Sequence, residues 1–196
     1  MKIFQLIILF IGLTTTSTWS QVLSTYEVKY YDVPKKDSLY TVRELKEYQP
    51  EACKRVKHSS TNDFSEACST TGVTYNTKFS MNDGFCSLNK LGVTSNTVIT
   101  IPKFQTDNEF HQKKYDEYSQ GLLMHELGHF EIYKKIIPEI DTAFKNIQKS
   151  KDCEVIKSEV NLITEKYLSP TGMLRSLNGD YDKNTKGGRS QYKSPF

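Results

Sequence analysis

The sequence has little excess of either charge, few cysteines and only one short apolar run. Its 26 lysine and arginine residues stand against 23 aspartate and glutamate residues, which gives a formal net charge of +3. So small an excess argues against a nucleic-acid-binding protein with a dominant basic face. The mean hydropathy of −0.56 excludes a protein that crosses a membrane several times. The 196 residues are enough for one domain with a buried core.

The apolar run lies at the N-terminus. Lys2 precedes 11 largely apolar residues, Ile3 to Leu13, and small polar residues follow as far as Ser20. The run is too short to span a bilayer as a helix and is typical of a cleaved secretory signal peptide. We therefore expect a signal peptide at residues 1–20 and a single secreted or periplasmic domain at residues 21–196, with no membrane span. An uncleaved N-terminal anchor is the alternative.

The four cysteines include no C-x-x-C pair. In an exported chain they predict two disulfides, for which three pairings are possible. A zinc site built from cysteines is the competing interpretation.

The first half of the chain has the patterns of strands. Residues 26–31 alternate and predict a strand, residues 38–48 predict a short helix, and the polar residues 51–71 predict a long loop. Residues 72–104 are again strand-like, and Pro102 is expected to end pairing at an edge strand.

The second half has a helical period from about residue 109 to 147, where Pro138 is expected to kink or split the helix. Residues 152–167 predict a second helix, and residues 178–196 form a polar tail with almost nothing to bury. The predicted fold class is α+β: an N-terminal antiparallel or mixed sheet, then a long active-site helix and a second packing helix.

One motif on the long helix has the residue types of a catalytic metal site. His125, Glu126 and His129 form the pattern H-E-x-x-H. Residues four apart share a helix face, so that both histidines can bind one zinc ion while Glu126 acts as general base on a zinc-bound water. Two surface histidines without a metal are the alternative.

A catalytic zinc needs a third protein ligand. No histidine follows His129, and the position of a third histidine in the longer pattern H-E-x-x-H-x-x-G-x-x-H is Lys135. The remaining candidates are acidic groups on the second helix and in the polar tail, namely Glu154, Glu159, Glu165 and the segment Asp180-Tyr181-Asp182.

With these motifs the sequence resembles a family of predicted secreted bacterial zinc-dependent proteases, catalogued as a domain of unknown function (number 922). The resemblance covers most of the mature chain and is carried by the segment YEVKYYDVPKKDSLYTVREL, Gly84-Phe85-Cys86, the run from Tyr115 to His129, Asp152-Cys153 and Tyr181-Asp182-Lys183-Asn184-Thr185. It implies a small zincin-like domain that binds zinc.

The chain departs from the family at its late motif. The family pattern is similar to Y-D-x-x-T-x-H-G, and Gly187 stands here in place of the histidine. Asp182 is the first candidate for the third ligand, and Asp180 and Tyr181 are its competitors. Asp180 and Tyr181 could instead support the site, either by hydrogen bonding to a ligand or by stabilising the transition state. Asp182 could instead accept a hydrogen bond from a ligand histidine, or lie in a solvated turn.

The resemblance also implies the cysteine pairing. Cys86 and Cys153 fall where the family carries cysteine, so we expect a Cys86–Cys153 bridge and a local Cys53–Cys68 bridge.

The expected function is that of a secreted zinc metallopeptidase acting on a protein or peptide substrate. A catalytically impaired module that binds a metal or a partner, and a cell-wall amide hydrolase, are the alternatives. The strand at residues 96–101 could be a sheet edge that pairs with an extended substrate, although ordinary sheet packing explains its pattern equally.

Overall fold

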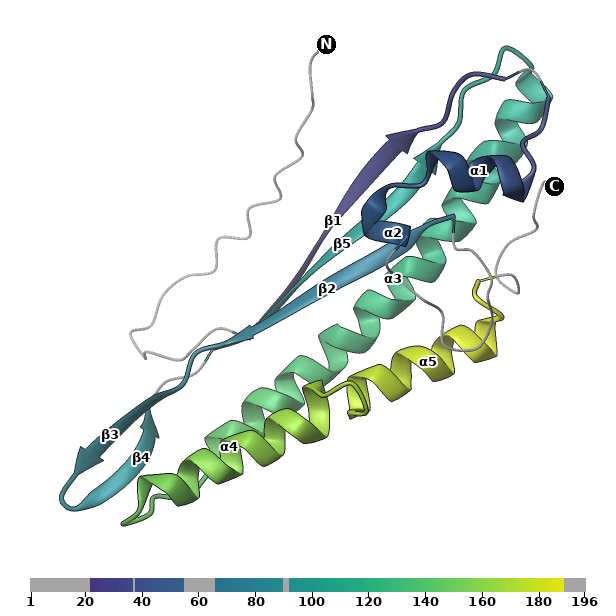
Figure 1. The fold of residues 1–196 in the computed structure, drawn as a ribbon. Coiled ribbons are helices and arrows are strands. Elements are labelled where there is room, and N and C mark those ends of the chain that lie inside the picture. The colour runs from purple at the N-terminus through teal and green to yellow at the C-terminus, as the bar shows by residue number, and fades with distance from the viewer. Residues whose placement is uncertain (1–21, 37, 55–65, 90–91, 189–196) are drawn as a thin grey trace, which may run out of the picture.

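The protein is described by a computed structural model over residues 22–36, 38–54, 66–89 and 92–188. This part of the chain has α+β architecture, with a mixed sheet followed by long helices, as the sequence predicts. In chain order the elements are β1 (Leu23–Asp32), α1 (Val42–Tyr48), α2 (Glu51–Lys54), β2 (Cys68–Tyr75), β3 (Lys78–Asn82), β4 (Phe85–Asn89), β5 (Val93–Lys103), α3 (Glu109–Lys145), α4 (Cys153–Leu168) and α5 (Met173–Thr185). Figure 1 shows α3 running beside the sheet, with α4 and α5 following one another along it.

The main sheet has the strand order β1-β5-β2. β1 pairs with β5 in parallel over its whole length, and β2 pairs with β5 antiparallel. β3 and β4 form a separate hairpin, which turns at Asp83 and Gly84 with positive φ angles at both residues. The strand-like pattern of residues 72–104 therefore divides between two sheets.

The central position of β5 corrects two expectations. The strand at residues 96–101 is not a sheet edge, because β1 and β2 occupy both of its sides. Pro102 does not end the strand, because it pairs with Tyr31 of β1 inside β5. Its missing N–H is tolerated there, since the pairing with β2 ends at Thr100 and β5 has one strand partner at Pro102.

Two boundaries in the first half of the chain also differ from expectation. The first helix starts at Val42 rather than residue 38, because Thr41 forms a capping box with Glu44. The segment 51–71 is not wholly a loop, since it holds α2 and the start of β2; its residues 55–65 lie outside the described ranges.

α3 is the long predicted helix, and the Asn108 side chain caps its N-terminus. Its 37 residues run through Pro138 as one helix, so that of the two expected effects, a kink or a split, the split is wrong. The hydroxyl of Thr142 donates to the Pro138 carbonyl over 2.8 Å.

The core consists of two apolar clusters along α3. The first packs its N-terminal half against the sheet through Val33, Tyr40, Leu45, Ala67, Ile99, Ile101, Phe104, Tyr115, Tyr118 and Leu122. The second packs its C-terminal half against the start of β5 and the later helices, through Val93, Ile136, Ile137, Ile140, Phe144, Val160, Tyr167 and Leu174. The buried polar residues of the H-E-x-x-H motif lie on α3 between these clusters.

α4 confirms the second predicted helix, which begins after the N-cap Asp152. α5 was not expected. Residues 178–185, assigned from the sequence to a polar tail, form its second half. α5 contacts both α3 and α4, so this part of the chain covers the middle of α3 (Figure 1).

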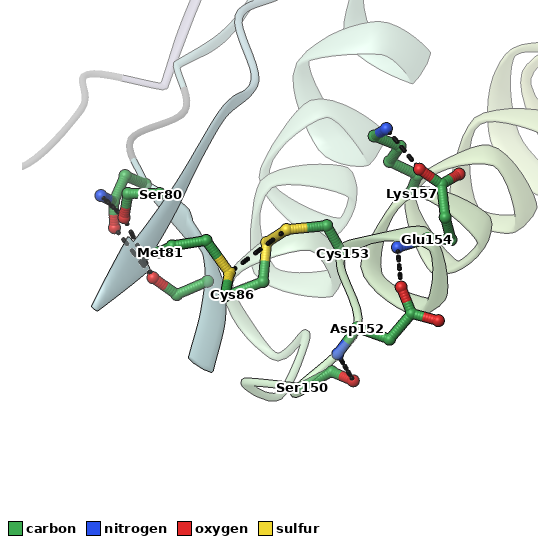
Figure 2. Close-up of a disulfide and its surroundings, with 10 residues drawn as sticks. Ser80, Met81, Cys86, Ser150, Asp152, Cys153, Glu154 and Lys157 are labelled. Carbon is green, nitrogen blue, oxygen red and sulfur yellow. Dashed lines mark hydrogen bonds and ion pairs between the residues drawn. A yellow bond between two sulfur atoms is a disulfide. The ribbon is translucent and has the colours of Figure 1, made fainter. Parts of the chain in front are cut away.

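The two disulfides have the pairing that the resemblance implies. Cys53 of α2 bonds to Cys68 at the start of β2, and Cys86 of β4 bonds to Cys153 at the start of α4. Beside the second bridge, the main chains of Cys86 and Ser150 exchange hydrogen bonds of 2.7 and 3.1 Å. Figure 2 shows the Met81 sulfur beside this bridge, 3.6 Å from Sγ of Cys153. The β3–β4 hairpin is thereby fixed to α4.

The signal peptide expected at residues 1–20 lies outside the described residues and stays a prediction. In the described ranges, no helix combines the length and apolarity that crossing a membrane requires.

Candidate metal centre

The H-E-x-x-H motif occupies the middle of α3. His125, Glu126 and His129 are 3 %, 3 % and 8 % exposed. Burying polar groups costs free energy unless they are paired. Their burial therefore excludes the interpretation of these histidines as a solvated surface pair.

Asp182 comes to the two histidines from α5. Its Oδ1 atom lies 3.0 Å from Nε2 of His129 and 3.3 Å from Nε2 of His125. One potential ligand atom from each of the three residues lies within 4.8 Å of the other two. Asp182 thus forms one cluster with two histidines that precede it by 53 and 57 positions. It does not lie in a solvated turn.

The cluster could hold a metal ion, and its spacing can be compared with that of a zinc site. Ligands about 2.0–2.2 Å from a tetrahedral zinc lie roughly 3.3–3.6 Å from one another. The two distances between Asp182 and the histidines, 3.0 and 3.3 Å, are close to this spacing. Two histidines and a carboxylate are also a donor set of catalytic zinc sites, in which a fourth position holds water.

Outside the cluster, α5 also contacts the far nitrogen of each histidine. Nδ1 of His129 lies 2.7 Å from Oδ1 of Asn178, and Nδ1 of His125 lies 3.4 Å from the Thr185 hydroxyl. Asn178, Asp182 and Thr185 are spaced by four and three positions, which places them on one helix face. One face of α5 therefore meets both nitrogens of both rings.

Tyr181 packs directly on the motif. Its ring stacks on His125 at 5.1 Å between centroids, and its hydroxyl donates to the His125 carbonyl over 3.2 Å. A Cβ atom at Gly128 would lie only 2.0 Å from the Tyr181 oxygen. The glycine of H-E-L-G-H thus lets Tyr181 approach α3, and the hydroxyl is directed at the α3 main chain.

Gly187, which takes the place of the histidine in the resembled pattern, directly follows Lys186, the C-cap residue of α5. It has a left-handed φ of +62°, and its N–H donates to the Asp182 carbonyl over 2.7 Å. Glycine adopts this conformation without the steric cost of a side chain. Gly187 thus continues the left-handed turn that begins at Lys186, and it offers no side-chain ligand.

The cluster is electrostatically suited to a cation. Burial by itself lowers the pKa of His129, but the hydrogen bond to Asp182, the charges of Glu126 and Asp182, and the Asn178 contact raise that pKa, with a net upward shift. In the metal-free chain the surroundings of this ring therefore favour positive charge.

The other predicted candidates lie elsewhere. Asp180 is exposed. It precedes Asp182 by two positions, which is a rotation of about 200° around α5, so its side chain points away from the cluster. On α4, Glu154 is exposed and pairs with Lys157, and Glu165 is exposed. His111, a histidine outside the motif, lies in the first turn of α3, about 21 Å along the axis from His125.

Sequence reasoning missed Asn178 and Thr185. Leu174, Asn178, Tyr181 and Thr185 recur at spacings of four, three and four, which is the period of a helix face. That spacing is the available signal, but the face is largely polar, and its residues from Asn178 onward fall in the segment predicted as a polar tail.

The comparisons with known proteins identify a family and nothing finer. The model of a family described as "Bacterial protein of unknown function (DUF922)" matches residues 28–188. No curated protein and no solved structure matches the chain. The matched range contains His125, His129 and Asp182.

Proposed function

The chain belongs to this bacterial family of unknown function, and we propose that it is a zinc-dependent metallopeptidase with a zincin-like site. The observation that carries the proposal is the meeting of His125, His129 and Asp182 beside the buried carboxyl group of Glu126. The three residues would hold the zinc ion. Bound zinc would lower the pKa of a water molecule from about 15.7 toward about 7 and polarise a substrate carbonyl.

Glu126 is the proposed general base. It follows His125 directly on α3 and is almost fully buried. Its carboxylate takes a proton from the attacking water and then delivers that proton to the amide nitrogen of the leaving group. One residue thereby serves both proton transfers of peptide-bond hydrolysis.

The proposed place of action is outside the cytoplasm, by secretion or in the periplasm. The two disulfides support this, because such bonds persist in oxidising compartments. The N-terminal apolar run of the sequence is its second support.

The first experiment is metal analysis of the purified mature chain after expression in zinc-rich medium. We expect about one equivalent of zinc per chain. A His125→Ala/His129→Ala variant serves as the unloaded control. Less than about half an equivalent in the parent chain would contradict the proposal.

The second experiment tests hydrolysis with a mixture of denatured proteins and short peptides. The parent chain should cleave them, a chelator should stop cleavage, and added zinc should restore it. Glu126→Gln should retain zinc and lose hydrolysis, because an amide cannot accept the proton. Cleavage by the Glu126→Gln variant would remove Glu126 from the role of base.

A module that binds zinc without hydrolysis is the second candidate. Gly187, which offers no side chain where the resembled family has histidine, favours it. Bound zinc with no chelator-sensitive cleavage would support this candidate over the peptidase. Cleavage of peptidoglycan amides, with proteins left intact, would instead indicate a cell-wall amide hydrolase.

A further inference from the structure

The Asn178 amide has a defined orientation. Its Nδ2 donates to the Leu174 carbonyl over 2.7 Å, one turn earlier on α5. Its Oδ1 consequently faces Nδ1 of His129, also at 2.7 Å. A carbonyl oxygen can only accept, so this contact is a hydrogen bond only when Nδ1 of His129 carries a proton.

The proton position decides which nitrogen can bind a metal. A neutral imidazole has one N–H and one lone pair. With the proton held on Nδ1, the lone pair lies on Nε2, which is the atom that lies 3.0 Å from Oδ1 of Asp182. Without metal, Asp182 favours the other proton position, because its carboxylate attracts a proton to Nε2 of His129.

We infer that Asn178 is a positioning residue, which holds His129 in the Nδ1–H form and presents the Nε2 lone pair to a metal at the His125–His129–Asp182 cluster. The inference rests on the proposed function as far as the metal is concerned. The preference of Asn178 for the Nδ1–H form can be measured without metal, on a neutral ring from which Asp182 has been removed. Thr185 has a corresponding but longer contact to His125, at 3.4 Å.

The first test measures the tautomer without metal. Asp182→Ala removes the competing acceptor at Nε2, and nitrogen-15 NMR at a pH where the ring is neutral reports which nitrogen holds the proton. We expect Nδ1–H for His129 in Asp182→Ala and a shift to Nε2–H in Asp182→Ala/Asn178→Leu. A His129→Gln variant assigns the signal. A predominant Nε2–H form in Asp182→Ala would overturn the inference.

The second test measures zinc affinity by competition with a chromophoric chelator. Asn178→Leu should bind zinc about 10- to 100-fold more weakly, which is the usual cost of losing the outer partner of a ligand histidine. Asn178→Asp keeps an acceptor and should restore tight binding. The matched control is Asn184→Leu at an exposed position of the same helix, which should bind zinc like the parent chain.

The outcomes separate this inference from the proposed function. Unchanged zinc affinity in a folded Asn178→Leu variant would overturn the positioning role. If Asn178→Leu does not fold, the tautomer measured in Asp182→Ala still supports or overturns the role of Asn178. If the parent chain binds no zinc, the proposed function fails, while the NMR result still supports or overturns the role of Asn178.

Discussion

Gly128 and Tyr181 are in a contact that no other residue at position 128 would allow. A Cβ atom on Gly128 would lie 2.0 Å from the Tyr181 hydroxyl oxygen and 2.3 Å from Cζ. The tyrosine ring in turn stacks on His125. The separation of α3 and α5 beside His125, His129 and Asp182 therefore depends on the absence of a side chain at Gly128.

Gly128→Ala should destabilise the protein by about 1–3 kcal/mol, the usual cost of overpacking. In an ordinary helix interior the same change stabilises by up to about 1 kcal/mol. Chemical denaturation measures the difference. Gly179→Ala on α5 is the control, because its Cβ would meet nothing within 4 Å, and it should be neutral or stabilising. Adding Tyr181→Ala should make the cost of Gly128→Ala smaller, because it removes the clashing ring.

Tyr181→Phe should leave most of the activity. The hydroxyl donates to the His125 main chain, so its loss should cost about 0.5–1.5 kcal/mol of stability and less than about tenfold in kcat. Loss of a donor that stabilises the transition state costs about 100- to 1,000-fold. A fall of that size would restore the transition-state role that the sequence suggested. Tyr30→Phe, at an exposed position of β1, controls for general effects.

The parts of the structure that local pattern determines could be predicted. The spacing of His125 and His129 and the apolar period of α3 are properties of one helix. Alternation similarly marked β1 and most of β5. Whether β5 is central or at an edge of the sheet depends on its pairing with strands that are far away in sequence. Local pattern does not report that pairing, and the expectation of a substrate-binding edge at residues 96–101 is therefore wrong.

The helix α5 could not be predicted for a related reason. Its inward face carries Asn178, Asp182 and Thr185, which are polar and suggest exposure to solvent. They are partly buried because the rings of His125 and His129 meet them from α3. Polar residues that are buried by pairing carry no hydrophobic period. The late Y-D-x-x-T match named Asp182 as a candidate but did not indicate a helix.

Removing the Cys86–Cys153 bridge should cost more stability than removing the Cys53–Cys68 bridge. The bridges close loops with sequence separations of 67 and 15 residues. Loop-closure entropy then gives about 4.4 and about 3 kcal/mol for the two bonds. Denaturant titrations of the Cys86→Ala/Cys153→Ala and Cys53→Ala/Cys68→Ala chains measure the two values. The reverse order would show that contacts near the bridges, rather than loop closure, set their contributions.

Zinc should stabilise the protein through Asp182. At a free zinc concentration 1,000 times the dissociation constant, binding adds about 4 kcal/mol to the free energy of unfolding. Loss of an outer partner of a ligand weakens binding about 10- to 100-fold, and loss of a ligand should weaken it at least as much. For Asp182→Ala, a 100-fold loss would reduce the stabilisation at the same zinc concentration to about 1.4 kcal/mol. Denaturation with and without zinc measures this effect.

The control for Asp182 is Asp180→Ala on the same helix. Asp180 is exposed and points away from the cluster, so its removal changes the net charge of α5 without touching the histidines. Zinc should stabilise Asp180→Ala as much as the parent chain. Equal stabilisation of Asp182→Ala would mean that Asp182 is not a ligand, because the affinity would then depend on His125 and His129 alone. A loss in both variants would indicate that the charge of α5, rather than the Oδ1 atom 3.0 Å from His129, determines the affinity for the ion.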